Sequence, residues 1–166
     1  MKKLITSICA FLSFTIAAQP LDTTDFEASA PRITINSSQP DNIWQIGTPS
    51  KSNFTSAYQS LRAITTDTVN PYPDSNFSQF TYGFELYGSA PFIEFTHKFD
   101  TDSNHAGGYV EMSPDNGNTW LLLSDTTWKM LFLDAYGFSC SNFYSVNDSL
   151  PGNKIGFTGT SSTWVT

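Results

Sequence analysis

Short runs in which apolar and polar residues alternate constrain this sequence more than any other feature. In the clearest runs, at 80–86, 93–99 and 110–112, every second residue is apolar, with His97 taking one such place. A two-residue period puts these side chains on one face of an extended chain, so each run predicts a strand with one buried face. Further short strands are expected at 24–28, 33–36, 42–46, 58–65, 119–124, 154–157 and 163–165.

Segments rich in Pro, Gly, Asn and Asp separate these runs, at 70–74, 115–118 and 150–153. Such residues form tight turns. Helical patterning is weak, because no stretch of three turns carries a clean apolar stripe and 130–136 accommodates one turn at most. Many short strands separated by turns are typical of an antiparallel β-sandwich or jelly roll, so we expect an all-β fold. Residues 163–166 read as a strand that has only begun, so we expect the domain to be incomplete at its C-terminus.

The first 18 residues have the layout of a secretory signal peptide. Two lysines precede a mostly apolar stretch at 4–17, and Ala17 and Ala18 offer a cleavage site. The stretch is short for a membrane-spanning helix, which needs about 20 residues, although an uncleaved membrane anchor is the alternative. The sequence therefore predicts a signal peptide at 1–18 and one secreted or cell-surface domain at 19–166.

Cleavage determines what the exported chain retains. No other apolar run approaches ~18 residues, so no membrane span is expected after cleavage. Cys140 is the one cysteine that remains, which rules out an internal disulfide. We expect it to be a small buried hydrophobe rather than a nucleophile. A domain of ~150 residues buries about 68–70% of its unfolded surface, which is enough for a core without cross-links.

The charge balance narrows the class of partner. The whole chain carries a formal charge of −7, and 14% of its residues are charged while 15% are aromatic. Disordered chains show the opposite balance, so a folded domain is expected. Nucleic-acid binding needs clustered Lys and Arg, so the acidic balance argues against nucleic acid as a partner.

One motif can be named from its residues alone. The segment 113–120 matches the Asp-box pattern Ser-x-Asp-x-Gly-x-Thr-Trp. Its defining residues are Ser113, Asp115, Gly117, Thr119 and Trp120. The carboxylate accepts backbone N–H groups of its own turn, the glycine allows a positive φ, and the tryptophan packs back over the hairpin. We therefore expect a structural hairpin rather than a ligand contact.

Several segments together carry a resemblance to a known family. They are Asp25-Phe26-Glu27, Trp44-x-x-Gly-x-Pro at 44–49, the runs at 92–100 and 107–113, the Asp-box and 156–164. In this order and spacing they resemble jelly-roll modules of the reelin-repeat and MAM-like kind. Such modules accompany immune inhibitor A-type metallopeptidases and occur in surface proteins exported by bacterial type IX secretion. The resemblance implies a jelly roll that often binds calcium.

Two departures from that family pattern stand out. Ala106 precedes Gly107-Gly108 at a place where family members often carry aspartate, so one potential ligand carboxylate is missing. The closing strands that follow the late tryptophan in the family are also missing, which agrees with an incomplete domain.

The sequence contains no recognisable catalytic constellation. A zinc peptidase would need a pattern such as His-Glu-x-x-His on a helix, whereas His97 and His105 are eight residues apart in strand and loop patterns. We expect His97 to be a hydrogen-bonded core residue, with catalysis as the alternative. A sialidase would need clustered arginines, and the chain has only Arg32 and Arg62. Paired carboxylates from distant strands, as in glycoside hydrolysis, stay open as an alternative.

A recognition role is the leading functional prediction. Trp128, Tyr136 and Tyr144 lie in the weakly patterned stretch 125–150, where flat rings would offer a platform for sugar or peptide. The alternative is that they cap the core beneath a long loop. We expect a non-catalytic recognition or adhesion module of an exported bacterial surface protein, which binds glycan or protein. The second hypothesis is an accessory domain of a secreted metallopeptidase whose catalytic part is absent from this chain.

Calcium is the one cofactor for which the sequence offers ligands. Asp100 and Asp102 are two residues apart, so an extended loop can aim both carboxylates the same way. Glu27 is a second candidate ligand by resemblance, and Glu111 is a third, although pairing with Lys98 is the simpler account of it. The alternative is that the two aspartates only solvate a hairpin loop.

Overall fold

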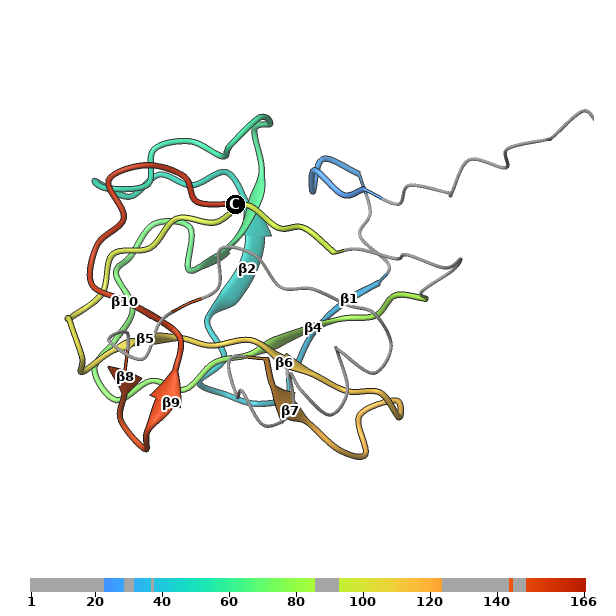
Figure 1. Cartoon of the computed structure of the whole chain (residues 1–166). Coiled ribbons are helices and arrows are strands. Elements are labelled where there is room, and N and C mark those ends of the chain that lie inside the picture. Colours follow the sequence, from blue (N-terminus) through green and yellow to red (C-terminus); the bar gives the residue numbers. More distant parts are fainter. Residues whose placement is uncertain (1–22, 29–31, 37, 86–92, 124–143, 145–148) are drawn as a thin grey trace, which may run out of the picture.

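The computed structural model of the 166-residue chain describes residues 23–28, 32–36, 38–85, 93–123, 144 and 149–166 (Figure 1). Within these residues the fold is all-β, as the alternating runs predict, and every sheet is an antiparallel pair of short strands. No helix in this part of the chain is long and apolar enough to cross a membrane.

The N-terminal half contains two of these pairs. Strand β1 (Ile33–Ile35) pairs with β4 (Phe80–Tyr82), and β2 (Trp44–Gly47) pairs with β3 (Ala63–Thr66). Trp44 and Phe80 join the two pairs, because their rings meet edge to face with centroids 4.7 Å apart. Such edge-to-face contacts are a favoured arrangement of aromatic rings.

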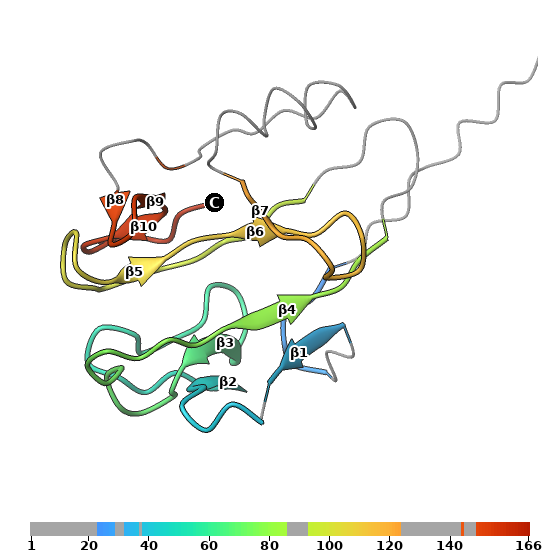
Figure 2. The ribbon, with the colours of Figure 1, turned by 90° about the horizontal axis from the view of Figure 1, so that it is seen from below.

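The C-terminal half contains the remaining pairs. They are β5 (Gly107–Gly108) with β10 (Phe157–Thr158), β6 (Glu111–Met112) with β7 (Leu121–Leu122), and β8 (Ser149–Leu150) with β9 (Lys154–Ile155). Figure 2 shows the pairs of the two chain halves on opposite sides of the molecule. Isolated β-bridges connect the segment 97–100 to the last residues of the chain. They pair His97 with Val165 and Asp100 with Thr160.

The predicted strand at 24–28 was wrong, because this segment bends. Phe26 takes a left-handed φ of 64°, which lies outside the β region. Asp25 reinforces the bend, since its Oδ1 accepts the backbone N–H of Glu27 at 3.1 Å. A short acidic side chain that bonds its own backbone two residues on competes with strand pairing.

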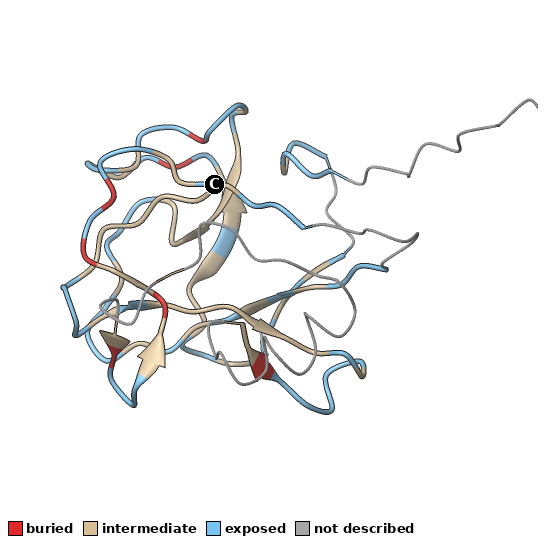
Figure 3. Ribbon diagram, in the orientation of Figure 1, coloured by how far each residue is buried: buried red, intermediate tan, exposed pale blue. Residues whose placement is uncertain are grey.

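An aromatic cluster lies in the described C-terminal half. It consists of Phe95, His97, Phe99, Tyr144 and Phe157, whose neighbouring ring centroids lie 5.0–5.9 Å apart. These contacts place Phe95, His97 and Phe99 on one face, as their alternation predicts. The predicted strand at 93–99 is reduced to an isolated bridge at His97, and Ile93 on the expected buried face is 53% exposed. Among the described residues, the buried hydrophobic ones are Ala57, Leu121 and Leu150 (Figure 3). Phe95 stays 45% exposed, so the cluster is buried only in part.

Gly107 and Gly108 allow this cluster to approach β5 closely. A Cβ atom on Gly108 would lie 2.6 Å from Cε1 and 2.9 Å from Cε2 of Phe157, and closer still to Cζ. Favourable carbon–carbon contacts are about 3.5–4.0 Å, so a side chain here would displace the Phe157 ring. The missing side chain is what lets the ring lie against the backbone.

Candidate functional site

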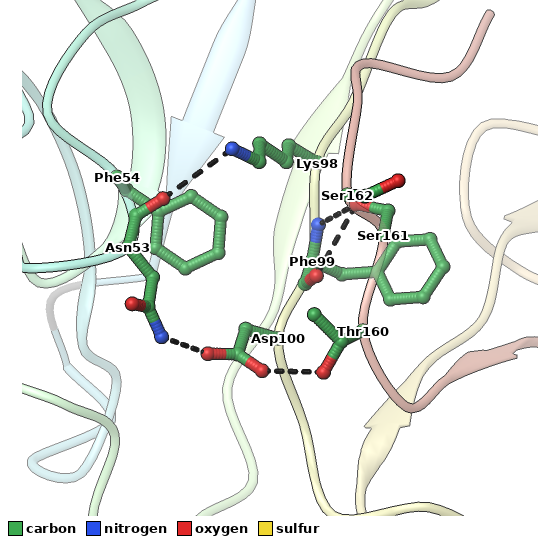
Figure 4. Close-up of a pocket in the computed structure, with 8 residues that line it drawn as sticks. All are labelled: Asn53, Phe54, Lys98, Phe99, Asp100, Thr160, Ser161 and Ser162. Atoms are coloured by element: carbon green, nitrogen blue, oxygen red, sulfur yellow. Dashed lines mark hydrogen bonds between the residues drawn. The ribbon is translucent and has the colours of Figure 1, made fainter.

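A pocket opens beside Asp100 where three distant segments meet (Figure 4). We call it the Asp100 pocket, and its volume is about 200 Å³. It is lined by Asn53, Phe54, Lys98, Phe99, Asp100, Thr160, Ser161 and Ser162. An aromatic ring, a carboxylate, an amide, an amine and hydroxyl groups therefore face one small volume.

Backbone pairing fixes the wall of the pocket. The N–H of Thr101 donates to Gly159 O at 2.8 Å, and the N–H of Ser161 donates to Phe99 O at 2.9 Å. The N–H of Phe99 in turn donates to Ser161 Oγ at 2.9 Å. These bonds hold Asp100 and Thr160 side by side in a paired backbone rather than in a free loop.

The segment 97–100 contributes to both the aromatic cluster and the pocket. Successive side chains of an extended segment point to opposite faces. His97 and Phe99 make ring contacts with Phe157 on one side, while Lys98 and Asp100 extend toward Asn53 on the other (Figure 4). Phe99 lines the pocket as well as packing against Phe157, so it connects the pocket to the aromatic cluster.

The Asp100 carboxylate is held at both oxygens. Its Oδ1 accepts the hydroxyl of Thr160 at 2.6 Å, and its Oδ2 accepts the side-chain amide of Asn53. These hydrogen bonds lower the pKa of Asp100 below its usual value, with Thr160 the larger cause, Asn53 the next and the charge of Lys98 a smaller one. Asp100 is therefore an oriented, ionised acceptor at neutral pH.

Lys98 and Lys51 flank the ring of Phe54. The Nζ atom of each lies 5.8 Å from the ring centroid, within the range of a cation–π contact. Lys98 also donates a long hydrogen bond, 3.5 Å, to the backbone oxygen of Asn53. Lys51 donates to Thr66 O, and burial lowers its pKa. The ammonium groups of both lysines therefore lie over the Phe54 ring.

The candidate calcium ligands lie in different environments. Asp100 lies in the pocket described above. Asp102 is exposed in a loop, where its backbone oxygen accepts the N–H groups of His105 and Ala106. Glu27 Oε1 accepts the backbone N–H groups of Leu61 and Arg62 at 2.6 and 2.7 Å. In the part of the chain that the structure describes, no three His, Cys, Asp or Glu residues are grouped closely enough to hold a metal ion.

Glu111 makes an ion pair, but with a different lysine from the one expected. Its Oε1 lies 3.3 Å from Nζ of Lys154, not beside Lys98. Lys154 is brought there by β9, and its Nζ also lies 3.9 Å from the ring centroid of Tyr109. Lys98 instead turns toward Asn53, because the segment around it pairs with the end of the chain.

The aromatic candidates for ligand binding are only partly placed. Trp128 and Tyr136 lie outside the described residues. Tyr144 is half-buried in the aromatic cluster, where its hydroxyl lies 3.2 Å from Nε2 of His97. This contact favours the alternative that Tyr144 covers the core, and it gives His97 the hydrogen bond expected of a core histidine. Burial lowers the pKa of His97.

The Asp-box folds as a local network. Asp115 Oδ1 accepts the backbone N–H of Thr119 at 2.8 Å, and Oδ2 accepts its hydroxyl at 2.7 Å. Ser113 Oγ accepts the N–H of Gly117, whose φ is +88°. Trp120 lies over the turn, since a Cβ on Gly117 would be 3.7 Å from its ring. The ring stays 47% exposed, so it covers the turn without being buried in a core.

Several pocket residues had no signal in the sequence. Asn53, Phe54, Thr160 and Ser162 sit in irregular segments far from Asp100 along the chain. Lys98 and Asp100 are two residues apart. This spacing was a usable signal, because it places both side chains on the face opposite His97.

This chain matches no protein-family model, and no curated protein or solved structure is significantly similar to it.

Proposed function

We propose that this chain is a non-catalytic recognition or adhesion module of an exported bacterial surface protein, and that it binds glycan or protein. The observation that carries the proposal is the Asp100 pocket, which places polar groups of several kinds beside the ring of Phe54. Small-molecule sites combine apolar surface with a few placed polar groups in this way.

The acid–base chemistry of the pocket favours binding over hydrolysis. Glycoside hydrolysis uses two carboxyl groups about 5–9.5 Å apart, one of them protonated. Among the described residues that line the pocket, Asp100 is the one acid, and its lowered pKa keeps it ionised. An ionised carboxylate with both oxygens already bonded is suited to accepting hydroxyl groups rather than to donating a proton.

We further infer that the strand pairs belong to an antiparallel β-sandwich of the jelly-roll type, as in the reelin-repeat and MAM-like modules that the sequence resembles. The antiparallel pairing of every described sheet supports this assignment. The placement of the two chain halves on opposite sides of the molecule also supports it (Figure 2). The signal-peptide pattern of residues 1–18 supports export, and calcium binding at Asp100 and Asp102 stays a prediction.

An array that carries both glycans and cell-surface proteins tests the proposal. The labelled chain should be retained on a restricted subset of the spots, and the retained ligands should have unchanged masses after elution. Retention on no spot would overturn the recognition role, whereas hydrolysed ligands would make the chain an enzyme.

The second candidate is an accessory domain of a secreted metallopeptidase. The resemblance favours it, because similar modules accompany immune inhibitor A-type enzymes. The sequence of the gene on both sides of this segment separates the candidates. A zinc-peptidase motif in the same reading frame supports the accessory role, and a sorting domain without such a motif supports adhesion.

A further inference from the structure

We propose that the Asp100 pocket binds a single neutral sugar unit through two adjacent hydroxyl groups, an assignment that rests on the recognition function proposed above and makes its ligand specific. The inference combines four properties of the pocket: its hydrogen-bonding pattern, its preorganisation, its aromatic wall and its size. Each is taken from the described residues.

The hydrogen-bonding groups of the pocket match a pair of hydroxyls. Each oxygen of the Asp100 carboxylate accepts one hydrogen bond within the protein, which leaves further lone pairs for a ligand. The Asn53 amide uses one N–H for Asp100 and has a second N–H and a carbonyl oxygen. One sugar hydroxyl can therefore donate to Asp100 while its neighbour accepts from Asn53. The hydroxyls of Thr160 and Ser162 extend the same surface (Figure 4).

These groups are held in place before a ligand arrives. Asp100 is bonded on both oxygens, and its backbone neighbours Phe99 and Thr101 pair with Ser161 and Gly159. Ordering of side chains is a major cost of binding, and a site that is already ordered avoids much of it. Weak individual hydrogen bonds to a sugar can then give measurable affinity.

The aromatic wall and the charges select a neutral sugar. The Phe54 ring offers apolar surface for the C–H groups of a sugar ring, next to the Lys98 ammonium that lies over it at 5.8 Å. Lys98 and Asp100 line the same pocket, so their opposite charges balance. An acidic sugar would gain attraction from Lys98 but would face repulsion from the ionised Asp100. A neutral ring avoids this conflict.

The size of the pocket favours a small ligand. Sites for drug-sized ligands are about 300–1,000 Å³, and this pocket of about 200 Å³ is smaller. A terminal or branching monosaccharide unit fits such a volume better than an extended oligosaccharide. A single sugar unit of this kind should bind with a dissociation constant on the order of 1 mM.

Two-dimensional NMR of the ¹⁵N-labelled whole chain tests this assignment. The probes are methyl β-galactoside, methyl β-glucoside and methyl α-mannoside, with methyl β-glucuronide as the acidic counterpart. At least one neutral glycoside should shift the Asn53 side-chain amide and the backbone amides of 98–100 and 160–162. Asp100→Asn, which keeps the shape of the side chain, should weaken binding at least about tenfold. Phe54→Leu should weaken it less.

The control is Asp74→Asn, a change of the same chemistry at an exposed residue that does not line the pocket, which should leave the affinity unchanged. Excess chelator should also leave it unchanged, because the proposed contacts need no ion. Each variant is checked for an unchanged thermal midpoint, and Asn53→Ser replaces Asp100→Asn if the latter unfolds.

The outcomes separate this inference from the function on which it rests. Shifts confined to another surface, such as that around Trp120, would overturn the pocket assignment and leave glycan recognition standing. Binding of the glucuronide alone, or binding that survives Asp100→Asn, would also overturn it. If no glycoside binds while the array retains protein ligands, the sugar assignment is wrong and the recognition function is not. If nothing binds in either experiment, both are wrong.

Discussion

Replacing Gly108 by alanine should destabilise the fold through a single added methyl group. The new Cβ would lie 2.6 Å from Cε1 of Phe157 and 2.9 Å from Cε2. Because carbon atoms pack favourably at about 3.5–4.0 Å, the ring must retreat by about 1 Å or more. Phe157 cannot retreat freely, since its ring contacts His97 at 5.0 Å and Phe99 at 5.1 Å between centroids. The strain therefore spreads into the aromatic cluster.

The size of the effect follows from two opposing contributions. Overpacking of this kind typically costs about 1–3 kcal/mol of folding free energy. Alanine has less conformational entropy than glycine in the unfolded chain, which offsets about 0.4–1 kcal/mol of that cost. A net loss of about 1.3 kcal/mol corresponds to a fall of roughly 3–5 °C in the thermal midpoint for a chain of this length. Circular dichroism melting measures this change.

Gly83→Ala is the matched control. A Cβ at Gly83 would meet nothing closer than Arg32 O at 3.8 Å, an ordinary contact, and Gly83 does not have a positive φ. Its midpoint should stay within about 1–2 °C of the unchanged chain. Equal midpoints for Gly108→Ala and Gly83→Ala would refute the close approach of Phe157 to β5.

Three further predictions concern the histidine, the Asp-box and export. Burial lowers the pKa of His97 and so favours its neutral form in the fold. The contribution of this pKa shift to folding stability is full above the unfolded pKa of 6.5 and is lost as pH falls through the lower folded pKa. Thermal midpoints measured across that range should therefore fall toward acid pH, and His97→Gln should flatten this pH dependence. Asp115→Ala should lower the midpoint by removing the acceptor for Thr119 yet leave glycoside affinity unchanged, and a loss of affinity at full stability would contradict the structural role. Mass spectrometry of the exported chain should find an N-terminus near Gln19, and a retained Met1 would refute the signal-peptide prediction.

Local chemistry was predictable from the sequence wherever bonding partners are near in the chain. Every Asp-box hydrogen bond joins residues within four positions of one another, so the pattern at 113–120 was sufficient to predict it. The shared face of Phe95, His97 and Phe99 followed from their two-residue spacing in the same way. The same spacing could have placed Lys98 and Asp100 together on the opposite face, although Asp100 was expected in a loop with Asp102.

Partners chosen by tertiary pairing were not predictable. The Glu27 carboxylate accepts the backbone N–H of Leu61, 34 residues away, and no sequence pattern indicated this partner. Asn53 reaches Asp100 across 47 residues, from a segment without a strand pattern. Periodicity reports which face a side chain occupies but not which distant segment covers that face. The pocket therefore emerges only when the segments around residues 53, 100 and 160 are brought together.

A crystal structure of the whole chain with a bound neutral methyl glycoside tests the central claim most directly. The claim predicts one sugar ring between Asn53, Phe54 and Asp100, with adjacent hydroxyls within about 3.2 Å of the Asp100 carboxylate and the Asn53 amide. Its glycosidic bond should be intact. A sugar bound at another surface, a cleaved glycoside, or a pocket that stays empty at saturating glycoside would contradict recognition through the Asp100 pocket.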